Sequence, residues 1–326
     1  MAKTFPQRIN RYFYLARSYL KVLLTGKALS FPLTVQIQTQ SRCNGNCVFC
    51  PYPDVHQQFV QGTMDTELFE KIVEELASSR YRPGLLFELH NEPLLDGRIF
   101  NLIKYAKSRI PGITCATVTN GQLLDKFTLQ EIKESGIDII NVSVNAYSPE
   151  LYRKISGGLD YDRIINNITN LISDESLKRK TTVSFVLTRE NIKEVSQALQ
   201  HWRSMGVKTR TIDLLNRAGS VSKYSSLQLK NKHSIFSLPV KLGKYLIART
   251  IDFTGCYDPL YHITILFNGD VILCCDDWNR ANIVGNVKDS SIKKIWNSPA
   301  LNKIRKQISK KQYNQIAACK NCIKAK

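Results

Sequence analysis

The stretch Arg42-Cys43-Asn44-Gly45-Asn46-Cys47-Val48-Phe49-Cys50 places three cysteines in the spacing C-x3-C-x2-C. It directly follows residues 33–39, an alternating apolar segment that predicts a β-strand. Three thiolates can bind only three irons of a cubane [4Fe–4S] cluster, so the fourth iron keeps an open position for a ligand. The stretch therefore predicts an iron–sulfur site in the loop after the first strand of a sheet.

Zinc, or a set of buried apolar cysteines, is the competing interpretation of this stretch. A zinc site needs a fourth ligand, and His56 is the only local candidate in the sequence. The iron–sulfur interpretation is therefore favoured.

The composition is that of an ordinary globular protein, with 326 residues, 43% hydrophobic and 22% charged. No apolar run reaches the roughly 18 residues of a membrane span, and the N-terminus lacks the apolar core of a signal peptide. The segment Tyr12 to Leu24 predicts an amphipathic helix packed on the body rather than a membrane-surface anchor. Nine cysteines without a secretion signal indicate metal binding rather than disulfides, and we expect a cytoplasmic location.

The chain is strongly basic, with a formal net charge of +19 and a pI of about 9.5. From Lys288 onward the basic residues face one acid, Asp289. Such a face can attract nucleic acid, an acidic carrier protein, anionic lipid or a phosphorylated substrate, although a solvated helix face is the simpler interpretation. Only Trp296 and Tyr313 interrupt the charges with aromatic rings, which argues against nucleic-acid binding as the function.

Strand and helix patterns alternate along the first two thirds of the chain, which predicts an α/β fold. After the first strand, further strands are predicted at residues 85–89, 113–118, 139–144, 182–187 and 209–215. Six β–α units in series predict a parallel sheet, an open (β/α)6 partial barrel, with ligands at the carboxyl ends of its strands. We expect a helical extension at residues 1–30, the barrel at residues 31–220 and a small α+β domain at residues 221–326.

The small domain contains a second set of cysteines. Residues 220–237 are polar and predict a linker or surface loop, and Asn268-Gly269 between two alternating runs predicts a hairpin. The remaining candidate ligands are Cys256, Cys274, Cys319 and Cys322. Four thiolates complete a cluster with no open iron, or a zinc site. Side chains alternate along a strand, so only one of Cys274 and Cys275 can reach such a site, and the spacing from Gly269 favours Cys274.

The three-cysteine motif, with Phe49 before its last cysteine, resembles the defining motif of the radical S-adenosylmethionine (SAM) superfamily. The resemblance implies a TIM-like (β/α)6 partial barrel. It also implies that the open iron binds the amino and carboxylate groups of SAM, which is cleaved reductively to a 5'-deoxyadenosyl radical. The order Cys256, Gly269-x4-Cys274, Cys319-x2-Cys322 resembles the SPASM/twitch subgroup. Seven cysteines would be needed for the two SPASM clusters, so the twitch form with one auxiliary [4Fe–4S] cluster fits better.

The resemblance also implies which residues bind the cofactor. His90-Asn91-Glu92-Pro93 stands where the family often has Gly-Gly-Glu-Pro, with the two glycines replaced. The implied cofactor-binding residues are Phe49, Asn91, Glu92, Pro93, Asn120, Ser143, Asn145 and Thr188. Cys115 and Cys275 are left over; each is more often a core residue, but a thiol near the substrate could donate a hydrogen atom.

We therefore expect a radical SAM oxidoreductase that dehydrogenates or epimerises a small molecule, such as a sugar or aminocyclitol, which could be anionic. An electron donor such as flavodoxin or ferredoxin is implied. A peptide- or protein-modifying maturase is the alternative enzyme, less favoured because only about 30 residues precede the barrel. A non-enzymatic basic metal-cluster protein that binds RNA is the alternative of another class.

Overall fold

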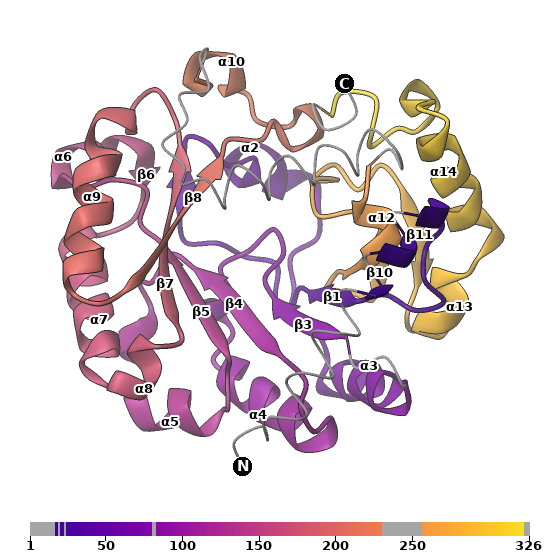
Figure 1. Cartoon of the computed structure of the whole chain (residues 1–326), viewed down its shortest axis with the longest axis horizontal. Helices are drawn as coiled ribbons and strands as arrows, with labels where there is room; N and C mark the ends of the chain where they lie inside the picture. The colour runs from indigo at the N-terminus through magenta and orange to yellow at the C-terminus, as the bar shows by residue number, and fades with distance from the viewer. Residues whose placement is uncertain (1–16, 19, 23, 80–82, 230–255, 323–326) are drawn as a thin grey trace.

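The computed structural model describes residues 17–18, 20–22, 24–79, 83–229 and 256–322. Its centre is one nine-stranded sheet in the order β11-β10-β9-β1-β3-β4-β5-β7-β8. Figure 1 shows this sheet curved, with helices α3, α4, α5, α7 and α9 along its outer face. None of the described helices is long and apolar enough to cross a membrane.

The six predicted parallel strands are present and pair side by side. They are β1 (Thr34–Ile37), β3 (Gly84–Phe87), β4 (Cys115–Thr119), β5 (Ile139–Ser143), β7 (Thr181–Leu187) and β8 (Lys208–Asp213). The helices that cover them are α3 (Thr66–Ser78), α4 (Ile99–Arg109), α5 (Leu129–Glu134), α7 (Tyr161–Ser173) and α9 (Ile192–Ser204). Each helix buries one apolar face in the main hydrophobic core, so the α/β prediction is confirmed.

Local sequence signals explain where individual helices begin. At the start of α5, the Thr128 side chain accepts from the Glu131 amide and the Glu131 side chain accepts from the Thr128 amide. Ser148 caps α6 (Pro149–Ile155), which has proline at its first position. The short elements are β2 (Asn46–Cys47), α2 (Tyr52–Val55), β6 (Ser156–Gly157), α8 (Glu175–Lys178), α10 (Tyr224–Leu227) and α12 (Asp258–Tyr261). Single 3-10 turns lie at His56–Gln58, Pro93–Leu95, Leu124–Lys126, Arg217–Gly219 and Tyr313–Gln315.

The C-terminal part extends the barrel sheet. The predicted hairpin forms from β9 (His262–Ile265) and β10 (Asp270–Ile272), with Gly269 in the left-handed conformation at φ 90°. Strand β9 also pairs in parallel with β1, which the sequence pattern did not predict. Strand β11 (Ile283–Asn286) and helices α13 (Ile292–Trp296) and α14 (Pro299–Ser309) follow.

The N-terminal segment packs on this C-terminal part. The described residues between Arg17 and Thr25 are helical, and Val22 is fully buried against Leu260 and Tyr261. The indole of Trp296 donates a hydrogen bond to the carbonyl of Leu29 at 2.7 Å. The predicted amphipathic helix is therefore observed over its described residues; residues 12–16, 19 and 23, and residues 230–237 of the predicted linker, lie outside them.

Candidate iron–sulfur active site

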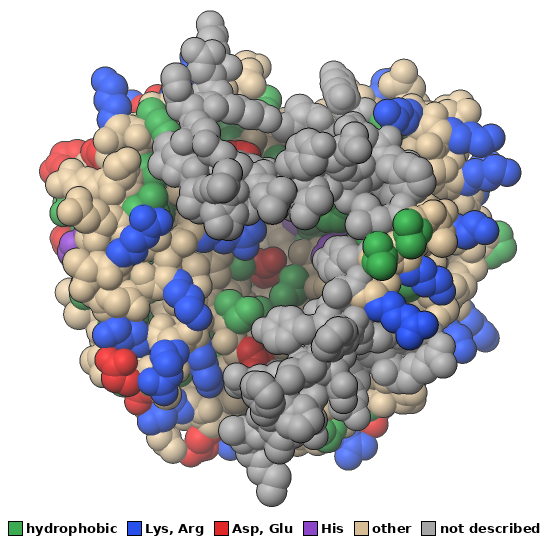
Figure 2. Space-filling view, viewed as in Figure 1, with side chains coloured by type: hydrophobic (Ala, Val, Ile, Leu, Met, Phe, Trp, Pro, Cys, Tyr) green, Lys and Arg blue, Asp and Glu red, His purple; other side chains and the backbone are tan. Residues whose placement is uncertain are grey.

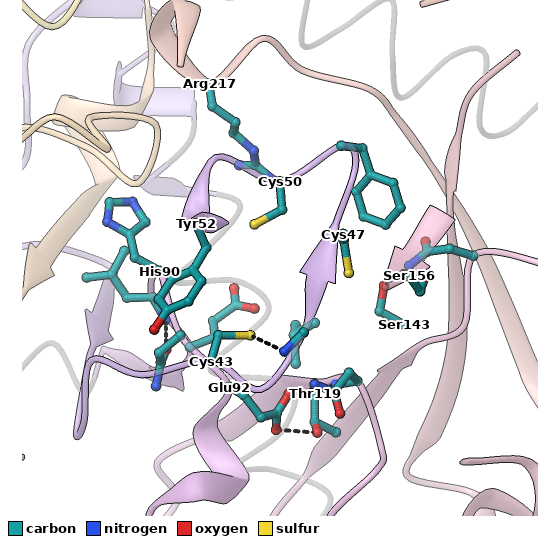
Figure 3. A pocket seen from close by; sticks show the side chains of 18 of the residues that line it. Cys43, Cys47, Cys50, Tyr52, His90, Glu92, Thr119, Ser143, Ser156 and Arg217 are labelled. Atoms are coloured by element: carbon teal, nitrogen blue, oxygen red, sulfur yellow. Dashed lines mark hydrogen bonds between the residues drawn. The ribbon is translucent and has the colours of Figure 1, made fainter. Parts of the chain in front are cut away.

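A pocket of about 270 Å³ lies at the carboxyl ends of the barrel strands. Figure 2 shows this face of the molecule hollowed near its centre. Cys43, Cys47 and Cys50 line the pocket (Figure 3), together with residues that follow β3, β4 and β5. This is where ligands bind in parallel α/β folds, so the sequence motif and the fold select the same site.

A small antiparallel ladder holds the cysteine loop in place. Strand β2 pairs with β6, and the amide of Val48 donates to the carbonyl of Ile155 at 3.0 Å. Gly158 has φ 79°, and a Cβ atom there would lie 3.2 Å from the carbonyl oxygen of Asn44. Glycine therefore permits both the left-handed turn and the close approach of the two loops.

The three thiols lie in surroundings that disfavour free thiolates. Burial raises the pKa of Cys43 to about 12, and burial also raises the pKa values of Cys47 and Cys50. Nearby thiolates raise the pKa values of Cys43 and Cys47 further. Converging buried thiols of this kind need a bound cation to become thiolates, and the irons of a cluster supply that charge.

The donor set fits a cubane. In the described part of the chain, no three His, Cys, Asp or Glu side chains are grouped closely enough to hold one metal ion. A [4Fe–4S] cluster does not require such a group, because each thiolate binds a different iron. Cys43, Cys47 and Cys50 would each hold one iron and leave the fourth open toward the pocket.

Glu92 organises the loops around the pocket. Its side chain is buried, at 2% exposure, and accepts hydrogen bonds from Thr119 Oγ1 at 2.5 Å, the Asn120 amide at 2.8 Å and the Leu94 amide at 3.0 Å. Burial raises the pKa of Glu92, and these hydrogen bonds oppose the shift. Glu92 thus joins the loop after β3 to the end of β4.

Asn145 has a comparable role at the end of β5. It adopts φ 66°, donates to Ser143 Oγ at 3.0 Å and accepts from the Val186 amide at 2.8 Å. Asn191 donates to the Asn145 carbonyl at 2.7 Å and accepts from the Thr188 amide. The polar residues at the ends of β5 and β7 therefore form one hydrogen-bonded network.

Most of the residues predicted to bind the cofactor meet at this pocket, but not all. Those that line it are Phe49, Asn91, Glu92, Asn120, Ser143 and Asn145. Pro93 and Thr188 do not line it: Pro93 is buried in a 3-10 turn, and Thr188 is 1% exposed within the network of Asn191. Their predicted contact with the cofactor therefore has no support in this geometry.

The two left-over cysteines are in different places. Cys275 lines the pocket. Cys115 begins β4, at the end of the strand opposite to the pocket, and is fully buried in the hydrophobic core. This is the core position expected as the commoner role of Cys115, and hydrogen-atom donation from Cys115 to a substrate in the pocket has no support in this geometry.

The pocket lining also contains side chains that were not predicted as site residues, among them His90, Glu88, Arg217 and Trp278. His90 has φ 53° and stacks on Trp278 at 3.9 Å between ring centroids, while its Nε2 hydrogen-bonds the carbonyl of Cys275 at 2.8 Å. Burial lowers the pKa of His90 to about 3, so the ring is neutral. Burial raises the pKa of Glu88 to about 7, although Arg217 opposes this. Glu88 is an acidic residue within the apolar segment 85–89 that the sequence predicts as a strand, and this was the only sign of it in the sequence.

The second cysteine set also converges. Burial raises the pKa of Tyr313, and the charges of Cys256, Cys319 and Cys322 raise it further, so the three thiols lie in the neighbourhood of its hydroxyl. Burial raises the pKa of Cys274, and Cys256 contributes to the shift. Burial, with Cys322 as the next cause, raises the pKa of Cys319 to about 12. Cys274 thus lies near Cys256, as expected for a member of this set, whereas its neighbour Cys275 lines the pocket.

Comparison with known proteins agrees with both sites. Residues 37–201 match the model of the radical SAM superfamily, and residues 256–323 match that of an iron–sulfur cluster-binding domain, SPASM. The S-adenosyl-L-methionine-dependent 2-deoxy-scyllo-inosamine dehydrogenase of Niallia circulans is 22% identical over 88% of this chain and 91% of its own. A probable GTP 3',8-cyclase of Methanococcus aeolicus is 26% identical over 59% of this chain and 62% of its own.

Solved structures share the fold. BtrN in complex with AdoMet and 2-DOIA has a TM-score of 0.61 at 20% identity, over 90% of this chain and 93% of that one. SuiB of Streptococcus suis, bound to its precursor peptide SuiA, has a TM-score of 0.66 at 16% identity, over 100% of this chain and 76% of that one. With the first family model covering half of the sequence, the protein belongs to the radical SAM superfamily and has [4Fe–4S] clusters and SAM as its cofactors.

Proposed function

We propose that this radical SAM enzyme oxidises a secondary alcohol of a small polyhydroxylated ring, such as a cyclitol, an aminocyclitol or a sugar. One observation carries the proposal: a single pocket is lined both by the cysteines of the first site and by Cys275 and Trp278, which follow Cys274 of the second site. A substrate in that pocket lies between the source of the radical and a second redox centre. The similarity to an aminocyclitol dehydrogenase supports the choice of substrate class.

The residues of the chain have separate tasks in this reaction. When bound, the cofactors supply a carbon-centred radical and a one-electron acceptor. Oxidation of a secondary alcohol to a ketone removes a hydrogen atom from carbon, a proton from oxygen and one further electron. Glu88 lines the pocket and, with a pKa of about 7, its carboxylate accepts the hydroxyl proton near neutral pH. Phe49 and Leu159 form apolar parts of the wall and exclude water.

The experiment is anaerobic reconstitution followed by turnover with dithionite, SAM and 2-deoxy-scyllo-inosamine. We expect about eight irons per chain, 5'-deoxyadenosine, and a ketone formed in equal amount. Absence of 5'-deoxyadenosine would contradict radical chemistry. Formation of 5'-deoxyadenosine with no ketone from this compound, or from a panel of inositols and hexoses, would contradict the proposed substrate class.

Epimerisation is the second candidate, because the Cys275 thiol lies in the pocket and could return a hydrogen atom to a substrate radical. The two reactions differ in D2O. An epimerase incorporates one solvent deuterium at the inverted carbon, and C275A abolishes product while 5'-deoxyadenosine still forms. A dehydrogenase forms ketone, and the product of C275A is the same as that of the unmodified enzyme.

The electron donor is also part of the proposal. Flavodoxins and ferredoxins are acidic, and α13 and α14 present an exposed basic surface visible at one edge of the molecule in Figure 2. Its lysines are Lys293, Lys294, Lys303, Lys306, Lys310 and Lys311. Reduction by flavodoxin is expected to slow as salt concentration rises, because exposed charges are screened.

A further inference from the structure

The loop Asn216–Ser220, directly after β8, has an unusual backbone. Arg217, Ala218 and Gly219 all have positive φ, at 48°, 55° and 89°. Residues other than glycine seldom adopt this region, and they keep it where the surrounding structure holds them. Two of the three positions are not glycine, so the contacts of this loop have to account for its shape.

Those contacts reach the second cysteine set. Asn216 Nδ2 donates to the carbonyl of Asn321 at 2.7 Å, and a Cβ atom on Gly219 would lie 2.8 Å from Asn321 Cβ. Asn321 stands between Cys319 and Cys322. Asn279 Nδ2 donates to Ser220 Oγ at 3.2 Å. The loop is therefore packed against the turn that carries two of the four auxiliary cysteines.

Within this loop, Arg217 contacts both sites. Its Nη1 donates to Asp276 Oδ1 at 2.8 Å, and Asp276 is 2% exposed and follows Cys274 by two residues. Arg217 also lines the pocket, where its guanidinium lies beside Cys50 (Figure 3). One guanidinium thus stands between a ligand of the first site and the segment that carries a ligand of the second.

We propose that Arg217 sets the reduction potentials of both iron–sulfur sites. Reduction adds negative charge to a cluster, so a nearby cation stabilises the reduced form and raises the potential, while a carboxylate lowers it. Arg217 acts directly on the site of Cys50, and it neutralises Asp276 beside the site of Cys274. This assignment concerns the two metal sites and does not depend on the substrate proposed above.

The test is an EPR-monitored redox titration of reconstituted protein without SAM or substrate. The auxiliary site is measured alone in a variant that carries C43A, C47A and C50A. We expect R217Q to make both potentials more negative, by at least a tenfold change in the reduction equilibrium, which is 59 mV for one electron. D276N is expected to shift the auxiliary potential in the opposite direction. The matched control is R203Q, which removes an exposed arginine on α9 and leaves the reduction equilibrium of both sites within threefold.

Two results would overturn the proposal. In the first, R217Q has full iron and sulfide content and its reduction equilibria change by less than threefold. In the second, R217Q and D276N shift the auxiliary potential in the same direction. If R217Q fails to take up iron, R217K decides. It keeps the charge but not the planar guanidinium, so retained potentials support the proposal. If the potentials of R217K are instead lowered by about 59 mV or more, the shift expected for loss of the charge, the proposal is overturned.

Discussion

The carboxylate of Glu92 accepts a hydrogen bond from the hydroxyl of Thr119 at 2.5 Å, which joins the loop after β3 to the end of β4. The same carboxylate accepts from the amides of Leu94 and Asn120. Removal of this acceptor leaves three donors without this partner, two of them buried and the Asn120 amide partly buried. The shape of the pocket floor therefore depends on one buried carboxylate.

For E92A we expect a loss of about 3 kcal/mol or more in the free energy of unfolding, measured by urea denaturation of the protein without cofactors. E92Q keeps one acceptor oxygen and should lose less than E92A. Equal losses in the two variants would show that side-chain volume, rather than hydrogen bonding, is the contribution of Glu92.

A variant with C43A, C47A and C50A is expected to keep about four irons per chain and to form no 5'-deoxyadenosine. The reason is that the auxiliary cysteines do not contribute to the first site. Iron, sulfide and 5'-deoxyadenosine assays measure both effects. C115A is the control, because Cys115 is fully buried in the core, and it should keep both clusters. SAM cleavage by the triple variant would refute the assignment of the first site.

The variants C274A and C275A are expected to differ in iron content. C274A should lose about half of the iron, because Cys274 lies with the auxiliary set, whereas C275A should keep about eight irons per chain. Mössbauer spectroscopy distinguishes the remaining clusters. The reverse result, with iron lost only from C275A, would exchange the two assignments.

The protonation state of Glu88 is expected to set the pH dependence of ketone formation. Its pKa is raised to about 7 by burial, so below pH 7 the carboxyl is protonated and does not accept the hydroxyl proton. The rate of ketone formation should rise with pH up to about 7 and then level off. E88Q should lower that rate by roughly 10²- to 10⁴-fold and remove this limb of the profile. An unchanged profile in E88Q would exclude Glu88 as the base.

The same group affects stability with a defined sign. The charges around Glu88 are Arg217 and Arg210, with Gln36 as a hydrogen-bond partner. The folded state binds the proton of Glu88 more tightly than the unfolded chain, in which the pKa of this carboxyl is 4.5. Stability contributed by the protonated carboxyl is therefore present below pH 4.5 and is lost as pH rises through about 7, on the order of 3 kcal/mol. In E88Q this slope should be absent from denaturation curves of the cofactor-free protein.

The sequence predicted those parts of the fold that depend on local periodicity. All six parallel strands and the hairpin appear, because alternation of apolar residues and an Asn-Gly turn are properties of neighbouring residues. The pairing of β9 with β1 was not predicted, since it joins residues such as Val35 and Ile263 that are far apart in the chain. Nothing in the local pattern of either strand specifies its partner.

The site divides in the same way. The spacing of Cys43, Cys47 and Cys50 predicted the first site, because three cysteines within one short loop lie near one another whatever the rest of the fold. Arg217 was missed because its role depends on a left-handed loop that brings it to Asp276. Trp278 was missed because its partner, His90, is in another part of the chain. Contacts between residues that are far apart in the chain cannot be predicted from any short segment of the sequence.

The pairing of β1 with β9 has a consequence for biogenesis. During synthesis on the ribosome, β1 emerges early, but one of its edges has no partner until His262–Ile265 has been translated. An unpaired strand edge is prone to association with other chains. The cysteine loop follows this strand, and Cys275 and Trp278 of the pocket follow β9 in the chain, so we expect the first site to be complete only after the C-terminal part has been made and paired.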